Sequence, residues 1–175
     1  MLSLIITVCV SFTFCDFKKE ESQNKLYNNE AVYVRVKTNI EEAKVLSDIS
    51  MLNETIIALS SLSLEKSSVY GIKTISNKLK KDNMEIRRSL NELAEKKLIL
   101  LPIRLDEKEI NELSKIDDTS FSKVYLNKVK ELLESEITEL EYLSTITNDL
   151  DFRVLTVKAL VKLNYNLYQT HKTLK

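Results

Sequence analysis

Apolar residues recur at every seventh position between residues 69 and 102, and this repeat limits the folds open to the chain. Its members are Ile72, Leu79, Ile86 and Leu93. A seven-residue repeat places its members along one face of a helix, so we predict an amphipathic helix with that face in a helical core. Asp82 and Asn83 interrupt the face, and a buried polar pair there needs hydrogen-bonding partners or water.

Residues that form turns are scarce in the rest of the chain. One glycine and one proline occur in 175 residues, too few for strand-and-turn architectures. We therefore predict an all-α fold, an antiparallel four-helix bundle of one domain over residues 40–175. The expected helices span about 40–66, 69–98, 120–147 and 149–171, with a short helix near 106–116 between the second and third. Expected loop and capping residues are Asp117, Asp118 and Thr119 before the third helix, and Asn148 and Asp149 before the fourth.

The N-terminal segment has the features of an export signal. Residues 2–14 carry no charge and are mostly apolar, long enough for the hydrophobic part of a signal peptide but short of the roughly 20 residues that span a bilayer. We predict a leader over residues 1–14 and a polar tether with an irregular lead-in over residues 15–39. The expected location is the periplasm or the outer membrane.

Cys15 lies where the apolar segment meets the polar one, which resembles the lipidated cysteine of bacterial lipoproteins. Phe14, however, occupies the place where a small residue usually precedes that cysteine, and no basic residue precedes the apolar run. The alternatives are a lipid anchor on Cys15, an ordinary cleaved signal and a frayed apolar N-terminus. We expect membrane association only through such an anchor.

The balance of charge bears on possible partners. The chain has 26 basic and 26 acidic residues, interspersed along its length. A chain without a field of one sign does not attract nucleic acid over a distance, so nucleic-acid binding is disfavoured. We therefore expect the partner to be a protein or another component of the cell envelope, whose identity the sequence does not give. Self-association through the broad apolar faces of the first and last main helices is a further possibility.

Candidate residues for catalysis or metal binding are few. The single histidine, His171, lies near the C-terminus and is expected to be a frayed surface residue. Without a core histidine, neither a Ser-His pair nor the Glu-x-x-His pairs of a di-iron bundle can form. The acidic run from Glu131 to Glu141 is expected to be a solvated face, with Glu136 nearest the apolar seam. We predict no catalytic site, no cofactor and no stoichiometric iron, zinc or manganese.

From residue 40 onward, the order of residues resembles the family of domain of unknown function 4142. The resemblance rests on Glu54 in the first helix, Asp82 in the second, the exit ELAEKKLILLP, and the Phe121 and Tyr125 opening of the third. Members of this family are exported bacterial proteins, often labelled as outer-membrane proteins, with a ferritin-like helical bundle. The resemblance therefore implies this fold and this location.

The chain departs from the family pattern at three histidine positions, which here are Asn83, Leu133 and Asn166. Any metal-binding or hydrogen-bonding role of those histidines cannot be carried over. Two interpretations of the polar core follow. Glu54 and Asp82 could share a proton across two helices, or Asp82 could join Asn83 and Asn166 in a polar network that fixes helix register. We favour the network.

On function, we expect a non-catalytic binding or structural module of the bacterial envelope. The alternative is a small-molecule or metal-binding ferritin-like bundle, which would need a pocket in the core rather than a filled seam.

Overall fold

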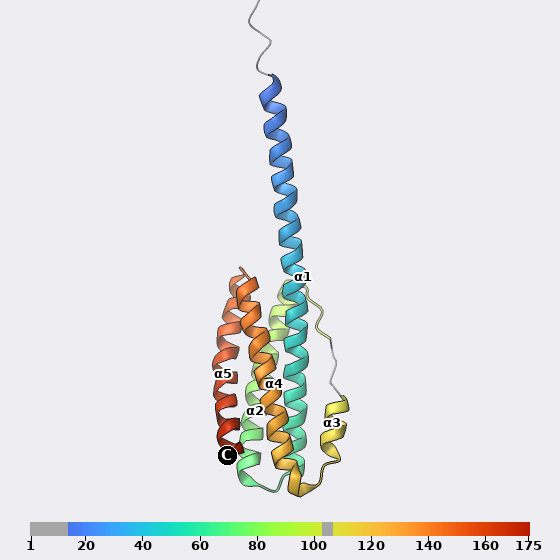
Figure 1. Ribbon diagram of the computed structural model, residues 1–175, viewed down its shortest axis with the longest axis vertical. Helices are drawn as coiled ribbons and strands as arrows, with labels where there is room; N and C mark the ends of the chain where they lie inside the picture. Colours follow the sequence, from blue (N-terminus) through green and yellow to red (C-terminus); the bar gives the residue numbers. More distant parts are fainter. Residues whose placement is uncertain (1–13, 103–106) are drawn as a thin grey trace, which may run out of the picture. The chain divides into compact units, whose positions relative to one another are not determined.

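The computed structural model describes residues 14–102 and 107–175, and Figure 1 shows their helices. The helices are α1 (Phe14–Lys66), α2 (Tyr70–Lys97), α3 (Glu107–Ser114), α4 (Asp118–Ile146) and α5 (Leu150–Leu174). No strand occurs within the described ranges. The all-α prediction is confirmed, and the four helices predicted after residue 69 end within a few residues of their expected bounds.

The first helix differs from the prediction. It begins at Phe14 rather than near residue 40, so the irregular lead-in expected over residues 15–39 is wrong. The physical reason is local propensity, because this segment contains no glycine or proline and is rich in lysine and glutamate. The chain divides into two compact units between Ile40 and Glu41. The predicted leader lies largely outside the described residues, and Cys15 belongs to the first turn of α1.

The unit from Glu41 to Lys175 is a four-helix bundle. Side-chain contacts join α1 to α2 and to α4, while α5 lies against α2 and α4. Neighbouring helices are antiparallel, so α2 and α4 run in the same direction and the connection between them travels the length of the bundle (Figure 1). This connection carries α3. A bundle with one long crossover has the topology of ferritin-like folds, as the sequence predicted.

The core consists of the inward faces of the four long helices. All four members of the seven-residue repeat of α2 are buried, which confirms its predicted face. In α5 six of the buried positions follow steps of four and three residues, the spacing of an inward-facing seam. They are Phe152, Thr156, Ala159, Leu163, Asn166 and Thr170, and Leu155 is buried beside them.

The stretch Arg35–Lys66 of α1 is long and apolar enough to cross a membrane by length and composition alone. Half of its most apolar window is buried within the protein. A buried core helix has the same composition, and the core residues of α1 account for it here.

Capping residues fix the starts of α4 and α5. Asp117 accepts hydrogen bonds from the backbone N–H groups of Thr119 and Ser120, and Asp149 accepts one from that of Asp151. Both caps agree with the prediction.

The end of α2 has another geometry. Leu98 adopts a left-handed conformation with φ of 57°, and its N–H donates to the carbonyl of Glu95. The helix therefore ends at Lys97, five residues before Pro102.

Candidate functional site

Three polar side chains meet inside the bundle, one each from α1, α2 and α4. The Nδ2 atom of Asn53 donates to Asn83 Oδ1 at 2.8 Å and to Glu136 Oε1 at 3.2 Å. Asn83 in turn donates from Nδ2 to the carbonyl of Leu79 at 2.8 Å. All three side chains are completely buried. We call Asn53, Asn83 and Glu136 the polar layer.

The seams of the three helices explain why these residues meet. Asn53 lies four residues after Ile49 and three before Ile56, and both isoleucines are fully buried. Asn83 and Glu136 occupy equivalent places on α2 and α4. Glu136 comes three residues after Leu133 and four before Leu140. Each polar residue thus occupies a position where helical geometry points a side chain into the core.

Burial dominates the electrostatics of Glu136. Removal of the carboxyl group from water raises its pKa from 4.5 to about 8, although the hydrogen bond from Asn53 acts in the opposite direction. The carboxyl is therefore predominantly protonated at pH 7. Among the described atoms, Glu136 Oε2 and Asn53 Oδ1 have no hydrogen-bond partner. The proton of a neutral carboxyl supplies one donor to a layer with an excess of acceptors.

Two of the predicted core residues lie elsewhere. Glu54 faces Arg87, with Oε2 at 3.3 Å from Nη1, and its side chain is 25% exposed. Asp82 is buried but pairs with Lys78 of its own helix at 2.7 Å. The less favoured interpretation, a proton shared between Glu54 and Asp82, is therefore wrong, because each carboxylate has a basic partner on α2. Glu54 is also not a core residue.

The predicted polar network is only partly correct. Asn83 does belong to a core network, but it bonds to Asn53 rather than to Asp82 or Asn166. Asn166 is buried on α5, and its Nδ2 atom has no partner among the described residues. The network observed in the core is therefore the polar layer, and not the predicted network of Asp82, Asn83 and Asn166.

The acidic face of α4 is as expected except at one position. Glu131, Glu134 and Glu141 are exposed. Glu136, the member of the run predicted to lie nearest the apolar seam, is completely buried because it lies on the seam. His171 is an exposed residue, with Nε2 at 3.8 Å from Glu134. The described part of the chain contains no group of three or more metal-ligating side chains.

A second feature is an apolar stripe along the solvent side of α5. The sequence indicated a broad apolar face on this helix but not that part of it remains uncovered. Val157 and Val161 are 64% and 69% exposed, and the other members are also exposed. Steps of four or three residues separate all of them, so they follow one side of the helix, opposite the core seam. We call these residues the α5 stripe: Leu150, Val154, Val157, Val161, Tyr165 and Tyr168.

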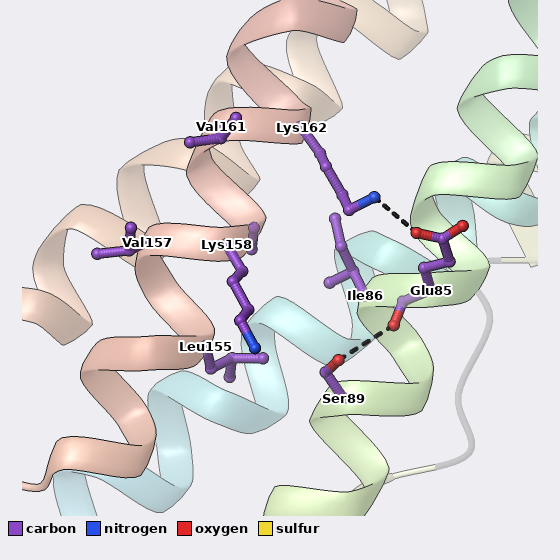
Figure 2. Close-up of a pocket in the computed structure, with 9 residues that line it drawn as sticks. Glu85, Ile86, Ser89, Leu155, Val157, Lys158, Val161 and Lys162 are labelled. Carbon is purple, nitrogen blue, oxygen red and sulfur yellow. Dashed lines mark hydrogen bonds and ion pairs between the residues drawn. The ribbon is translucent and has the colours of Figure 1, made fainter.

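A hollow of about 520 Å³ lies between α2 and α5 beside this stripe. Its apolar lining includes Ile86, Leu155 and two valines of the stripe, Val157 and Val161. Lys158 and Lys162 supply positive charge (Figure 2). Lys162 donates to Glu85 Oε2 at 2.6 Å. This hydrogen bond lowers the pKa of Glu85 and raises that of Lys162, so both groups remain charged at neutral pH.

The two features differ in what they can do. The polar layer is enclosed by the core, and its groups are two amides and one carboxyl. The α5 stripe and the adjacent hollow are open to solvent and combine apolar surface with a few charges, the composition of a binding surface.

Comparison with known proteins agrees with the fold. A family model described as Domain of unknown function (DUF4142) matches residues 33–172. The structure is also similar to the crystal structure of a DUF305 fragment from Deinococcus radiodurans. The TM-score is 0.63 at 12% sequence identity, over 76% of this chain and 94% of that one. At this identity the likeness concerns the fold alone. The search of curated proteins gave no match.

Proposed function

The chain belongs to the family of domain of unknown function 4142, and from this premise we propose that it is a non-catalytic binding module of the bacterial envelope. The observation that carries the proposal is the α5 stripe. Six large apolar side chains are exposed along one side of a single helix. Contiguous exposed apolar surface on a folded domain commonly marks an interaction site.

The hollow between α2 and α5 supports the same proposal. It adjoins the stripe and offers apolar walls into which a partner's side chain can insert. Lys158 lines this hollow, and no ion pair joins it to any residue that the structure describes. An apolar surface with an available charge beside it provides both affinity and orientation.

The polar layer supports a non-catalytic role. A general acid must reach substrate, and Glu136 is completely buried among core residues. Its hydrogen-bond partner is an amide rather than a nucleophile. A structural role for the layer, the pairing of α1, α2 and α4 in one register, is consistent with these contacts.

The proposed envelope location rests on the sequence of the leader, and the proposed lipid anchor rests on the position of Cys15. Mass spectrometry of the protein from native membranes would test both. We expect a mature N-terminus at Cys15 that carries a diacylglyceryl group, or otherwise a cleaved chain without lipid. A mature protein that retains Met1 and residues 2–14 would contradict export.

Site-specific cross-linking would test the binding role. A photoreactive amino acid at Val157 should form an adduct with a discrete partner in envelope fractions. The same group at Lys44, an exposed position of α1, should not. Absence of any adduct specific to Val157 would contradict the proposal.

A small-molecule ligand is the second candidate, because the volume of the hollow lies within the range of ligand pockets. Native mass spectrometry would distinguish it. A retained small molecule that is lost on Leu155→Glu would favour this candidate over a protein partner.

A further inference from the structure

The charges beside the α5 stripe are basic. From Phe152 to Lys175 the chain contains no aspartate or glutamate. Helical spacing places Arg153 on one side of the valines of the stripe and Lys158 on the other. Among the described residues, neither has an ion-pair partner. The acid of the first turn, Asp151, is already paired with Lys96 at 2.7 Å and with Lys97 at 3.2 Å.

The spacing of the stripe matches that of a helix-pairing seam. Leu150, Val154, Val157 and Val161 are separated by four, three and four residues, as the a and d positions of a heptad are. Arg153 and Lys158 then occupy the g and e positions. In paired helices, charges at these positions select the partner and set its orientation.

A second copy of this chain does not fit the surface. Pairing of two α5 stripes would place Arg153 and Lys158 of one copy beside basic residues of the other, and like charges across an interface are unfavourable. The acidic face of α4 is no better suited. Between Glu131, Glu134 and Glu139 it carries Ser135 and Thr138, which are polar where the stripe requires apolar contact.

A lipid surface also fits less well than a helix. Helices that lie in a membrane interface use wide faces with tryptophan, phenylalanine or leucine. The stripe consists mainly of valine and tyrosine, and the chain contains no tryptophan. The hollow beside the stripe can accept side chains from a helix that lies along α5 (Figure 2).

We infer that the partner docked on the α5 stripe is an amphipathic helix with an apolar seam flanked by acidic residues. Its apolar side chains contact Val154, Val157 and Val161, and its carboxylates pair with Arg153 and Lys158. This inference rests on the proposed function, because it names the partner class of the same surface.

Designed peptides of about three heptads provide the probe. One peptide carries leucine at a and d with glutamate at e and g, and a matched peptide carries lysine at e and g. Titration of fluorescein-labelled peptides with the full-length protein, near physiological salt, measures both affinities. We expect the glutamate peptide to bind at least about tenfold more tightly than the lysine peptide.

A charge-reversed variant makes the test independent of simple loss of folding. In Arg153→Glu/Lys158→Glu the preference should invert, so that the lysine peptide binds more tightly. A single Lys44→Glu variant on α1 should leave the original preference unchanged. Equal affinities, no binding of either peptide, or a preference that the double variant does not invert would each overturn the inference.

Other occupants give distinct results. Binding to phosphatidylglycerol vesicles without binding to the glutamate peptide would assign the surface to lipid and overturn the inference. A dimer in sedimentation that Val157→Glu dissociates would assign it to a second copy, with the same consequence. If a partner cross-links at Val157 but the two peptides bind equally well, the partner is not an acidic helix and the inference is overturned, while the proposed binding role stands. If no partner cross-links at Val157, the proposed function itself is contradicted.

Discussion

At the scale of single residues, the protonated state of Glu136 has a measurable effect on stability. A carboxyl group that keeps its proton in the folded protein up to about pH 8 would lose it near pH 4.5 when unfolded. Below pH 4.5 both states hold the proton, so this group contributes no pH dependence there. Between pH 4.5 and 8 only the folded state holds it, and the free energy of unfolding falls as the pH rises. Above about pH 8 the loss is complete.

We predict that Glu136→Gln removes this decline. Glutamine keeps the shape of the protonated carboxyl but does not ionise. The shift in pKa corresponds to a loss on the order of 5 kcal/mol in the wild type by pH 8. The variant should therefore be the more stable protein at pH 8, while the two differ little at pH 4.5. Urea unfolding at both pH values measures the difference.

Glu141→Gln is the matched control, because Glu141 is an exposed residue of the same helix. Its pH profile should follow that of the wild type. A Glu136→Gln variant with the wild-type profile would show that Glu136 is ionised in the folded protein at neutral pH.

At the scale of elements, the end of α2 is strained at one residue. Leu98 is the only non-glycine residue with positive φ in the described part of the chain, and its side chain is 93% exposed. A left-handed conformation costs a residue with a Cβ atom about 1–2 kcal/mol, whereas glycine adopts it readily. Glycine also makes the unfolded chain more flexible, and this offsets part of the free energy gained when the strain at residue 98 is removed.

We predict that Leu98→Gly raises the free energy of unfolding by about 0.5–1 kcal/mol. Urea unfolding measures the change. Leu100→Gly is the control, since Leu100 is equally exposed but has no positive φ, and it should be neutral or slightly destabilising. Destabilisation by Leu98→Gly would indicate that the leucine side chain contributes a contact of its own.

The inward face of α2 gives another prediction. Leu79 and Ile86 are almost completely buried, so Leu79→Ala or Ile86→Ala should lower the free energy of unfolding by about 2–5 kcal/mol. Met84 lies on the same helix but is 40% exposed, and Met84→Ala should cost much less. Similar costs at all three positions, again from urea unfolding, would contradict the assigned face.

Sequence patterns correctly predicted the features that are set within a single helix. The buried face of α2 followed from its repeat, and the caps at Asp117 and Asp149 followed from residue type. Contacts between helices depend on relative register, which a single sequence does not state. For this reason Asp82 and Asn166 were wrongly placed in one network with Asn83, and Asn53 was not recognised as the donor to Glu136.

A sequence signal for Glu136 did exist. The glutamate follows Leu133 by three residues and precedes Leu140 by four, the spacing of the seam. This spacing placed Glu136 nearest the seam, but the acidic run as a whole was expected to be solvated, because such a run is typical of a solvated face. The α5 stripe was less accessible to prediction, since an apolar residue shows its solvent exposure only when the bundle is assembled.

At the scale of the whole molecule, the core is confined to one unit. Among the described residues, every member of the hydrophobic core lies at or after Val45, inside the unit that begins at Glu41. We predict that a chain truncated to residues 41–175 folds cooperatively, with a midpoint of thermal unfolding within about 5 °C of the full-length value. Circular dichroism during heating measures it. A gradual, non-cooperative transition would mean that residues before Glu41 contribute to the stability of the bundle.

The connection between α2 and α4 runs the length of the bundle and divides the core between two helical hairpins. One hairpin is α1 with α2 and the other is α4 with α5, and each has its own short loop. The polar layer joins them, because Asn53 and Asn83 come from the first hairpin and Glu136 from the second. A break in this connection therefore leaves each hairpin covalently intact. We expect the two hairpins to recombine when they are produced as separate fragments, and recovery of the buried hydrogen bond between Asn53 and Glu136 would be the sign of reassembly.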